Sequence, residues 1–191
     1  MASLRITSGI LRGRMIPVPA HELRPTSNKA RQAFFNIVAS EIAGARFLDL
    51  FAGSGVFSFE AISRGAESAV AIDQSTRAVK EINGLAQEWN LPIRAMAADV
   101  LAGIRRLPKG DLFHVVFADP PYDYPNYDEL LDAIDREVPL ADEATIAIEH
   151  RSGEFPWSES TELTRLEIRR TANYGTVALT LFDAVTDGKC A

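Results

Sequence analysis

The sequence predicts an α/β fold in which a mostly parallel sheet is covered by helices on both faces. Two observations carry this prediction. From Arg46 onward, short apolar runs alternate with segments whose apolar residues recur at helical spacing, the pattern of buried parallel strands joined by crossover helices. The last part of the chain instead holds two β-prone runs around a turn. We therefore expect a seven-stranded sheet that ends in an antiparallel hairpin.

The segment before the first strand is predicted to form a small extension. Residues 5–8 and 11–16 flank Gly9 as a β-hairpin, and residues 28–42 form a helix with Thr26, Ser27 or Asn28 as its cap. This gives three parts along the chain: a basic hairpin extension over 1–27, one main domain over 28–185, and a flexible tail over 186–191.

The sheet and its helices follow in order. The expected strands are 47–50, 68–72, 93–97, 112–118, 144–148, 161–170 and 176–183, the last two separated by the turn signal Asn173-Tyr174-Gly175. One helical face is formed by Ala78, Val79, Ile82, Leu85, Ala86 and Trp89, and another by Tyr127, Leu130, Leu131 and Ile134.

Composition narrows the class of protein. A chain of 191 residues with 47% hydrophobic content can bury one substantial core. No apolar run approaches the ~18 to 20 residues of a spanning helix, and arginines interrupt the first residues, so we expect a cytoplasmic protein with no membrane partner. The single cysteine, Cys190, and the scattered His21, His114 and His150 give no metal-ligand spacing, and we expect no metal.

The charge is unevenly distributed. The net charge of −6 argues against a protein that coats nucleic acid indiscriminately. Residues 1–31, however, hold one acidic residue, Glu22, against six basic ones, which are Arg5, Arg12, Arg14, Arg24, Lys29 and Arg31. This segment is either a phosphate-binding surface or an ordinary solvated one.

A glycine-rich loop follows the first strand and leads into a helix. In Asp49-Leu50-Phe51-Ala52-Gly53-Ser54-Gly55 the glycines let the backbone approach a ligand at a helix N-terminus. A dinucleotide enzyme would have a third glycine where this chain has Ser58, which weakens a pyrophosphate interpretation. A tight turn without a ligand is the alternative.

Two further strand ends carry carboxylates. Asp73 ends the second strand, 18 residues after Gly55, where it can accept hydrogen bonds from ribose hydroxyls. Asp99, followed by Val100, comes after the third strand, where it can accept from an adenine amino group or cap the helix 100–107. Together with the glycine-rich loop, these residues predict an adenosine-binding crevice at the carboxyl ends of the strands.

The fourth strand ends in Asp119-Pro120-Pro121-Tyr122. The two prolines remove two N–H donors, so we expect the Asp119 side chain and the Pro120 carbonyl to accept hydrogen bonds from a planar amino group. Tyr122 offers a flat ring on which an unstacked base could lie, with core packing as its alternative role.

With these motifs the chain resembles class I S-adenosylmethionine-dependent methyltransferases, and more narrowly the RsmD family of 16S rRNA guanine-N2 methyltransferases. The similarity covers about residues 5–183 and rests on 9–14 (GILRGR), 24–36 (RPTSNKARQAFFN), 47–66 (FLDLFAGSGVFSFEAISRGA) and Asp119 to Tyr122. The last two motifs occur in many DNA and RNA methyltransferases. The first two are the narrower signature.

The resemblance implies a Rossmann-like methyltransferase fold and a role for each motif. S-adenosyl-L-methionine would bind against Asp49, Phe51, Gly53, Ser54, Gly55, Asp73, Asp99 and Val100. Asp119, Pro120, Pro121 and Tyr122 would hold the target base, and the six basic residues of 1–31 would grip RNA. The family more often has Glu where Asp73 stands, and Glu where Gln32 follows Arg31.

The implied function is methylation of a guanine N2 amine in 16S rRNA, within an assembling small ribosomal subunit, by a monomeric enzyme. Two alternatives remain open. The tetrapeptide also suits the N6 amine of adenine in DNA or RNA. A different class, a nicotinamide dehydrogenase or a non-catalytic nucleotide-binding α/β module, is disfavoured by Ser58 and by the acceptors of Asp119-Pro120.

Overall fold

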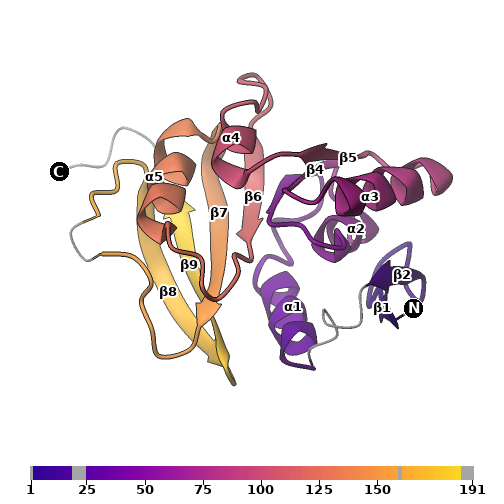
Figure 1. Cartoon of the computed structure of the whole chain (residues 1–191), viewed down its shortest axis with the longest axis horizontal. Helices are drawn as coiled ribbons and strands as arrows, with labels where there is room; N and C mark the ends of the chain where they lie inside the picture. The colour runs from indigo at the N-terminus through magenta and orange to yellow at the C-terminus, as the bar shows by residue number, and fades with distance from the viewer. Residues whose placement is uncertain (1, 19–24, 159–160, 186–191) are drawn as a thin grey trace.

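The computed structural model describes residues 2–18, 25–158 and 161–185, and shows a small hairpin beside a seven-stranded sheet (Figure 1). The hairpin pairs β1 (Ala2–Arg5) with β2 (Met15–Val18). The predicted tail and Arg24 lie outside the described residues. Across the described part of the chain, no helix is both long and apolar enough to cross a membrane.

The large sheet confirms the predicted α/β architecture. Its order is β5-β4-β3-β6-β7-β9-β8, with parallel pairing from β5 to β7 and with β9 antiparallel to both of its neighbours. The strands are β3 (Arg46–Leu50), β4 (Ser68–Asp73), β5 (Ile93–Ala97), β6 (Phe113–Ala118), β7 (Leu140–Arg151), β8 (Leu166–Tyr174) and β9 (Val177–Ala184).

In the described part of the chain, five helices cover the two faces of the sheet. They are α1 (Pro25–Ile37), α2 (Val56–Ser63), α3 (Thr76–Glu88), α4 (Val100–Ile104) and α5 (Tyr127–Glu137). One buried cluster joins α1, α2, α3 and the hairpin to one face, and a second joins α4 and α5 to the other. The predicted apolar face of α5 is buried, and that of α3 is buried at Val79, Ile82 and Ala86 and half-buried at its other positions.

Several predicted boundaries were wrong. The hairpin strands overlap the predicted 5–8 and 11–16 only at Arg5 and at residues 15–16, because residues 6–14 form the connecting loop. Helix α1 starts at Pro25, so its start lies before all three predicted caps; proline suits a first helical position because it needs no N–H partner there. It also ends at Ile37 rather than 42.

The other boundary errors lie in the second half of the chain. Helix α4 ends at Ile104 rather than 107. Strand β8 covers 166–174 rather than 161–170, so the turn before β9 falls at 175–176 and not at 173–175. Strand β7 runs well beyond the predicted 144–148, because its pairing with β6 and β9 holds the polar residues at its ends in the sheet.

The hairpin is anchored to α2 by buried polar contacts. Glu60 is fully buried and accepts hydrogen bonds from the Thr7 backbone N–H (2.9 Å), the Thr7 hydroxyl (2.6 Å) and Arg64 Nε (3.0 Å). The Ser63 carbonyl accepts from Ile10 N–H at 2.8 Å. Because buried polar groups of this kind are costly to separate from their partners, the hairpin is held firmly against the main domain.

Candidate functional site

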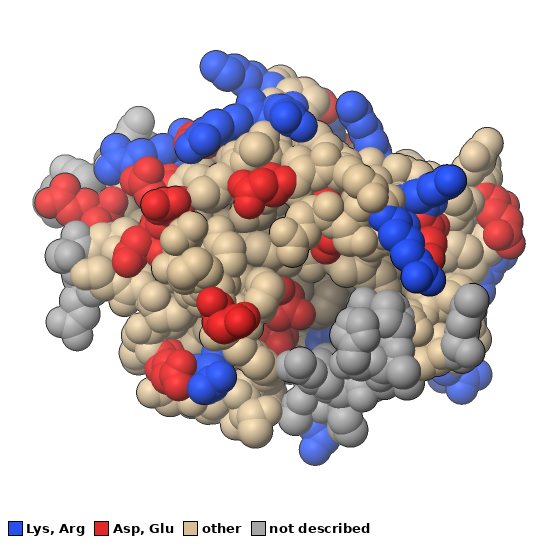
Figure 2. Space-filling view, viewed as in Figure 1, with Lys and Arg blue, Asp and Glu red and all other residues tan. Residues whose placement is uncertain are grey.

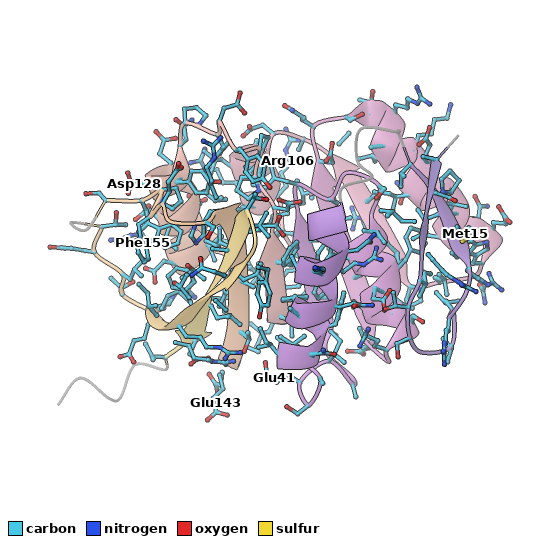
Figure 3. All side chains as sticks on the ribbon, turned by 90° about the horizontal axis from the view of Figure 1, so that it is seen from below. Met15, Glu41, Arg106, Asp128, Glu143 and Phe155 are labelled. Atoms are coloured by element: carbon cyan, nitrogen blue, oxygen red, sulfur yellow. The ribbon has the colours of Figure 1, made fainter. Side chains whose placement is uncertain are left out.

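A cavity of about 500 Å³ lies at the carboxyl ends of the parallel strands. This is where ligands bind in open α/β sheets, and the volume falls within the range of small-molecule sites. Its walls come from the loop after β3, from the ends of β4 to β7, and from the hairpin. In Figure 3, Met15 of the hairpin and Phe155, after β7, lie on opposite sides of the view.

The cavity wall is acidic. Six residues with carboxyl groups line the cavity, namely Asp49, Asp73, Asp99, Asp119, Asp123 and Glu149. Among the described residues, no Lys, Arg or His lines it. On the face drawn in Figure 2, acidic side chains lie beside the central hollow, and basic ones lie mainly along the upper and right-hand edges. Such a wall suits a cationic ligand and repels the pyrophosphate of a dinucleotide.

The loop after β3 is held in a conformation that costs backbone energy. Phe51 has φ 60°, Gly53 φ 51° and Gly55 φ 72°, the left-handed region that non-glycine residues rarely adopt. Phe51, Gly53 and Ser54 line the cavity as predicted. Gly55 does not line it: a Cβ there would lie 2.8 Å from Ile82 Cγ1, so this glycine serves the packing of α2 against α3.

Asp49 joins the end of β3 to the start of α2. One of its oxygens, Oδ2, accepts from the Ser58 backbone N–H at 3.0 Å and from the Ser58 hydroxyl at 2.7 Å. Ser58, which the sequence marked only as a missing third glycine, is therefore a partner of the predicted cofactor residue. Burial raises the pKa of Asp49 to about 7, and the Ser58 hydrogen bonds oppose that rise.

Asp73 and Asp99 both lie on the wall and both organise the backbone around it. Asp73 accepts from Gly53 N–H at 2.8 Å and from Ser75 N–H at 2.7 Å, which ties the end of β4 to the glycine-rich loop. Asp99 accepts from the N–H groups of Leu101 and Ala102 and so caps α4, which was the alternative role predicted for it. Asp99 also lines the cavity beside Val100, and its contact with adenine stays a prediction.

The tetrapeptide after β6 lies on the same wall as the residues predicted to bind adenosine. The Asp119 backbone N–H donates to the Leu50 carbonyl at 3.3 Å, which places the tetrapeptide next to the end of β3. Tyr122 is half-buried, with the Arg151 guanidinium 5.7 Å from its ring centroid. The structure thus brings the predicted base-binding residues and all but one of the predicted cofactor residues to one cavity.

Sequence reasoning missed several lining residues. Leu4 reaches the cavity from β1, and Phe57 and Phe117 reach it from α2 and β6. Tyr124 also lines it, with its ring packed edge-on against Phe51 at 5.1 Å between centroids. Glu149 lies at the end of β7, and the strand-end logic that found the other carboxylates could have found it as well.

The basic residues of the N-terminal segment divide into two groups. Arg5, Arg12 and Arg14 are exposed on the hairpin, and Lys29 is exposed on α1. Arg31 is only 3% exposed and donates to the Arg5 carbonyl and to Asn28 Oδ1, both at 3.1 Å. The predicted RNA contact by Arg31 does not fit this burial, since the guanidinium is used to join α1 to the hairpin.

No group of three or more His, Cys, Asp or Glu side chains in the described ranges is arranged to hold a metal ion.

Comparisons with known proteins agree on one family. The family described as "Conserved hypothetical protein 95" matches residues 4–183. Ribosomal RNA small subunit methyltransferase D of Escherichia coli K12 is 37% identical over 149 residues, 76% of this chain and 74% of that protein. A Bacillus subtilis protein provisionally named rRNA methyltransferase YlbH is 30% identical over 184 residues, 94% of this chain and 98% of that protein. The solved structure of yhhF from Escherichia coli, provisionally described as a methyltransferase, has a TM-score of 0.81 and 32% identity over 97% of this chain and 99% of that one. This chain belongs to the RsmD family of S-adenosylmethionine-dependent methyltransferases.

Proposed function

We propose that this enzyme methylates the exocyclic N2 amine of a guanine in 16S rRNA of the small ribosomal subunit. One observation carries the proposal: the tetrapeptide Asp119 to Tyr122 lies on the wall of the acidic cavity that is also lined by Asp73 and Asp99, the carboxylates predicted to bind adenosine. The choice of substrate is supported by the name of the Escherichia coli relative, a small-subunit rRNA methyltransferase.

The residues on the wall fit S-adenosylmethionine. Its cationic sulfonium and ammonium groups suit a wall with six carboxyl groups. We assign the ribose hydroxyls to Asp73, the adenine to the segment Asp99-Val100, and the methionine end to the loop Phe51 to Ser54 with Asp49 below it. When bound, S-adenosylmethionine supplies an electrophilic methyl group.

The tetrapeptide prepares the amine. An exocyclic base amine is a poor nucleophile because its lone pair is delocalised into the ring. Hydrogen bonds from the two amine hydrogens to the Asp119 carboxylate and the Pro120 carbonyl favour a more pyramidal nitrogen and fix its direction. Tyr122, with Arg151 at its ring, offers the surface on which the base stacks once it has left its helix. The nitrogen then releases one proton, to the Asp119 carboxylate or to water.

The hairpin is the proposed RNA grip. Arg5, Arg12 and Arg14 are exposed on it, and Lys29 is exposed nearby on α1, where they can contact phosphates. Because the protein is acidic overall, its non-specific electrostatic attraction to RNA is limited. We therefore propose that the substrate is a structured, assembling small subunit, and that the enzyme acts on it as a monomer.

Asp119→Ala tests the assignment. We expect the initial rate of tritiated methyl transfer to fall by roughly 10²- to 10³-fold or more, because an oriented hydrogen-bonding partner of the reacting amine is removed. Affinity for S-adenosylhomocysteine, measured by calorimetry, should change by less than about threefold. Asp142→Ala, an exposed acid near the opposite end of β7, serves as the control and should retain full activity. Near-normal activity of Asp119→Ala would contradict the proposal.

A further inference from the structure

Glu149 is a buried carboxylate on the cavity wall to which the proposed function gives no role. It is 4% exposed and lies within β7, where it is paired with Leu179 of β9. It also lines the cavity together with Asp119. A carboxylate that is held in a sheet and faces a ligand cavity is placed rigidly enough to recognise a specific group.

The sheet register places Glu149 next to Asp119. Ala118 of β6 pairs with Ile148 of β7 in parallel, so Asp119, which directly follows β6, and Glu149 of β7 each come one residue after this pair. Adjacent strands are about 4.7 to 4.9 Å apart, and both residues line the same cavity. Burial raises the pKa of the Tyr127 hydroxyl, and the charges of Asp119 and Glu149 raise it further, which places both carboxylates near one phenol.

The hydrogen-bonding edge of guanine presents one donor to which the proposed function assigns no acceptor. It presents two N2 hydrogens and, beside them, the N1 hydrogen. The proposed function assigns the two amine hydrogens to the Asp119 carboxylate and the Pro120 carbonyl, and it names no acceptor for N1–H. Adenine presents two amine hydrogens beside an N1 atom that carries a lone pair and no hydrogen.

We propose that Glu149 determines the identity of the target base by accepting a hydrogen bond from guanine N1–H. This inference rests on the proposed function. The same carboxylate would face the bare N1 lone pair of adenine, and two acceptors without a hydrogen between them repel each other in a buried site. Sites built to hydrogen-bond one group reject analogues that lack it by large factors, up to about 10⁴ to 10⁵.

The test compares guanine with 2-aminopurine at the nucleotide that the enzyme methylates. 2-Aminopurine keeps the reacting amine at the same ring position and has no hydrogen on N1. We expect wild-type kcat/KM for a subunit RNA carrying 2-aminopurine to be at least about 100-fold below that for guanine. A ratio within about threefold would overturn the inference, because the enzyme would then not read N1–H.

Glu149→Gln provides the second arm. Glutamine keeps the shape and an acceptor oxygen and adds an NH2 donor that can face the bare N1 of 2-aminopurine. We expect the ratio of kcat/KM for guanine to that for 2-aminopurine to fall to less than about tenfold in the variant, against at least about 100-fold in wild type. An unchanged preference in a folded, active Glu149→Gln enzyme would overturn the inference.

Asp135→Asn is the matched control. Asp135 is a fully buried acid on α5 that holds Thr164 and Arg165 and does not line the cavity. Its replacement should lower stability without changing the base preference, and a narrowed preference here would contradict a specific role of Glu149. Failure of the proposed function would give a different result, because the wild-type enzyme would then not methylate guanine at all.

Discussion

Gly9→Ala should undock the hairpin from the main domain. Gly9 has φ 77°, and a Cβ at this position would lie 1.6 Å from the Ser63 carbonyl oxygen, a backbone atom of α2 that cannot move aside. The loop must then leave α2. Three hydrogen bonds to Ser63 break with it: Ile10 N–H to the carbonyl, Leu11 N–H to Oγ, and Oγ to the Ser8 carbonyl.

The expected loss of stability is estimated by comparison with a control variant, Gly13→Ala, in the same loop. Gly13 has φ 91°, but a Cβ there would meet nothing closer than Arg5 Nη2 at 3.7 Å. Both alanine variants bear the cost of a left-handed conformation, roughly 1 to 2 kcal/mol. Gly9→Ala also breaks three hydrogen bonds at about 1 kcal/mol each, so it should be about 3 kcal/mol less stable than Gly13→Ala.

Urea unfolding of the two variants measures this difference directly. In thermal unfolding, the Tm of Gly9→Ala should lie roughly 6 to 12 °C below that of Gly13→Ala, given about 2 to 4 °C per kcal/mol for a chain of this size. Because Leu4 of the hairpin lines the cavity, affinity for S-adenosylhomocysteine should fall as well. Equal stabilities, within about 1 kcal/mol, would refute the docking described for the hairpin.

Two further predictions concern Asp49 and the hairpin arginines. Burial raises the pKa of Asp49 to about 7, so the folded state keeps a proton that the unfolded chain loses near pH 4, and stability falls as pH rises between these values. Asp49→Asn should remove this dependence. The difference in free energy of unfolding between the variant and wild type, measured by urea unfolding, should therefore change by roughly 2 to 3 kcal/mol between pH 5 and pH 8. Parallel pH profiles of the two proteins would contradict this prediction. Reversing the charge of Arg12 and Arg14 should weaken RNA binding and reduce the slope of log K against log salt by about 0.7 to 0.9 for each phosphate that the protein no longer neutralises. Arg170→Glu, on the far edge strand β8, should leave the slope unchanged, and an unchanged slope in the hairpin variants would remove them from the RNA site.

The sequence predicted the fold well where apolar pattern alone decides the structure. All seven strands of the sheet and the faces of α3 and α5 were found, because burial on a sheet or a helix face imposes a period that the residues display. Boundaries failed where tertiary partners decide them. Strand β7 extends past its apolar centre because two neighbours pair with it, and the hairpin strands are set by contacts of its loop with Glu60 and Ser63.

The site was predictable for groups that follow a strand, since parallel strands end at one edge. Asp49, Asp73, Asp99 and Asp119 were found in this way, and all four line the cavity. Leu4 could not be found, because only the folded hairpin brings it there. Arg31 was misjudged because the sequence shows its charge and hides its burial.

The most direct test of the central claim is to identify the methylated nucleoside. Tritiated methyl transfer would be measured with isolated 16S rRNA and with unmethylated small subunits, followed by digestion and mass analysis of the labelled nucleoside. We predict N2-methylguanosine, with more label entering the subunits than the isolated RNA. N6-methyladenosine as the product, or no label in either RNA, would contradict the account.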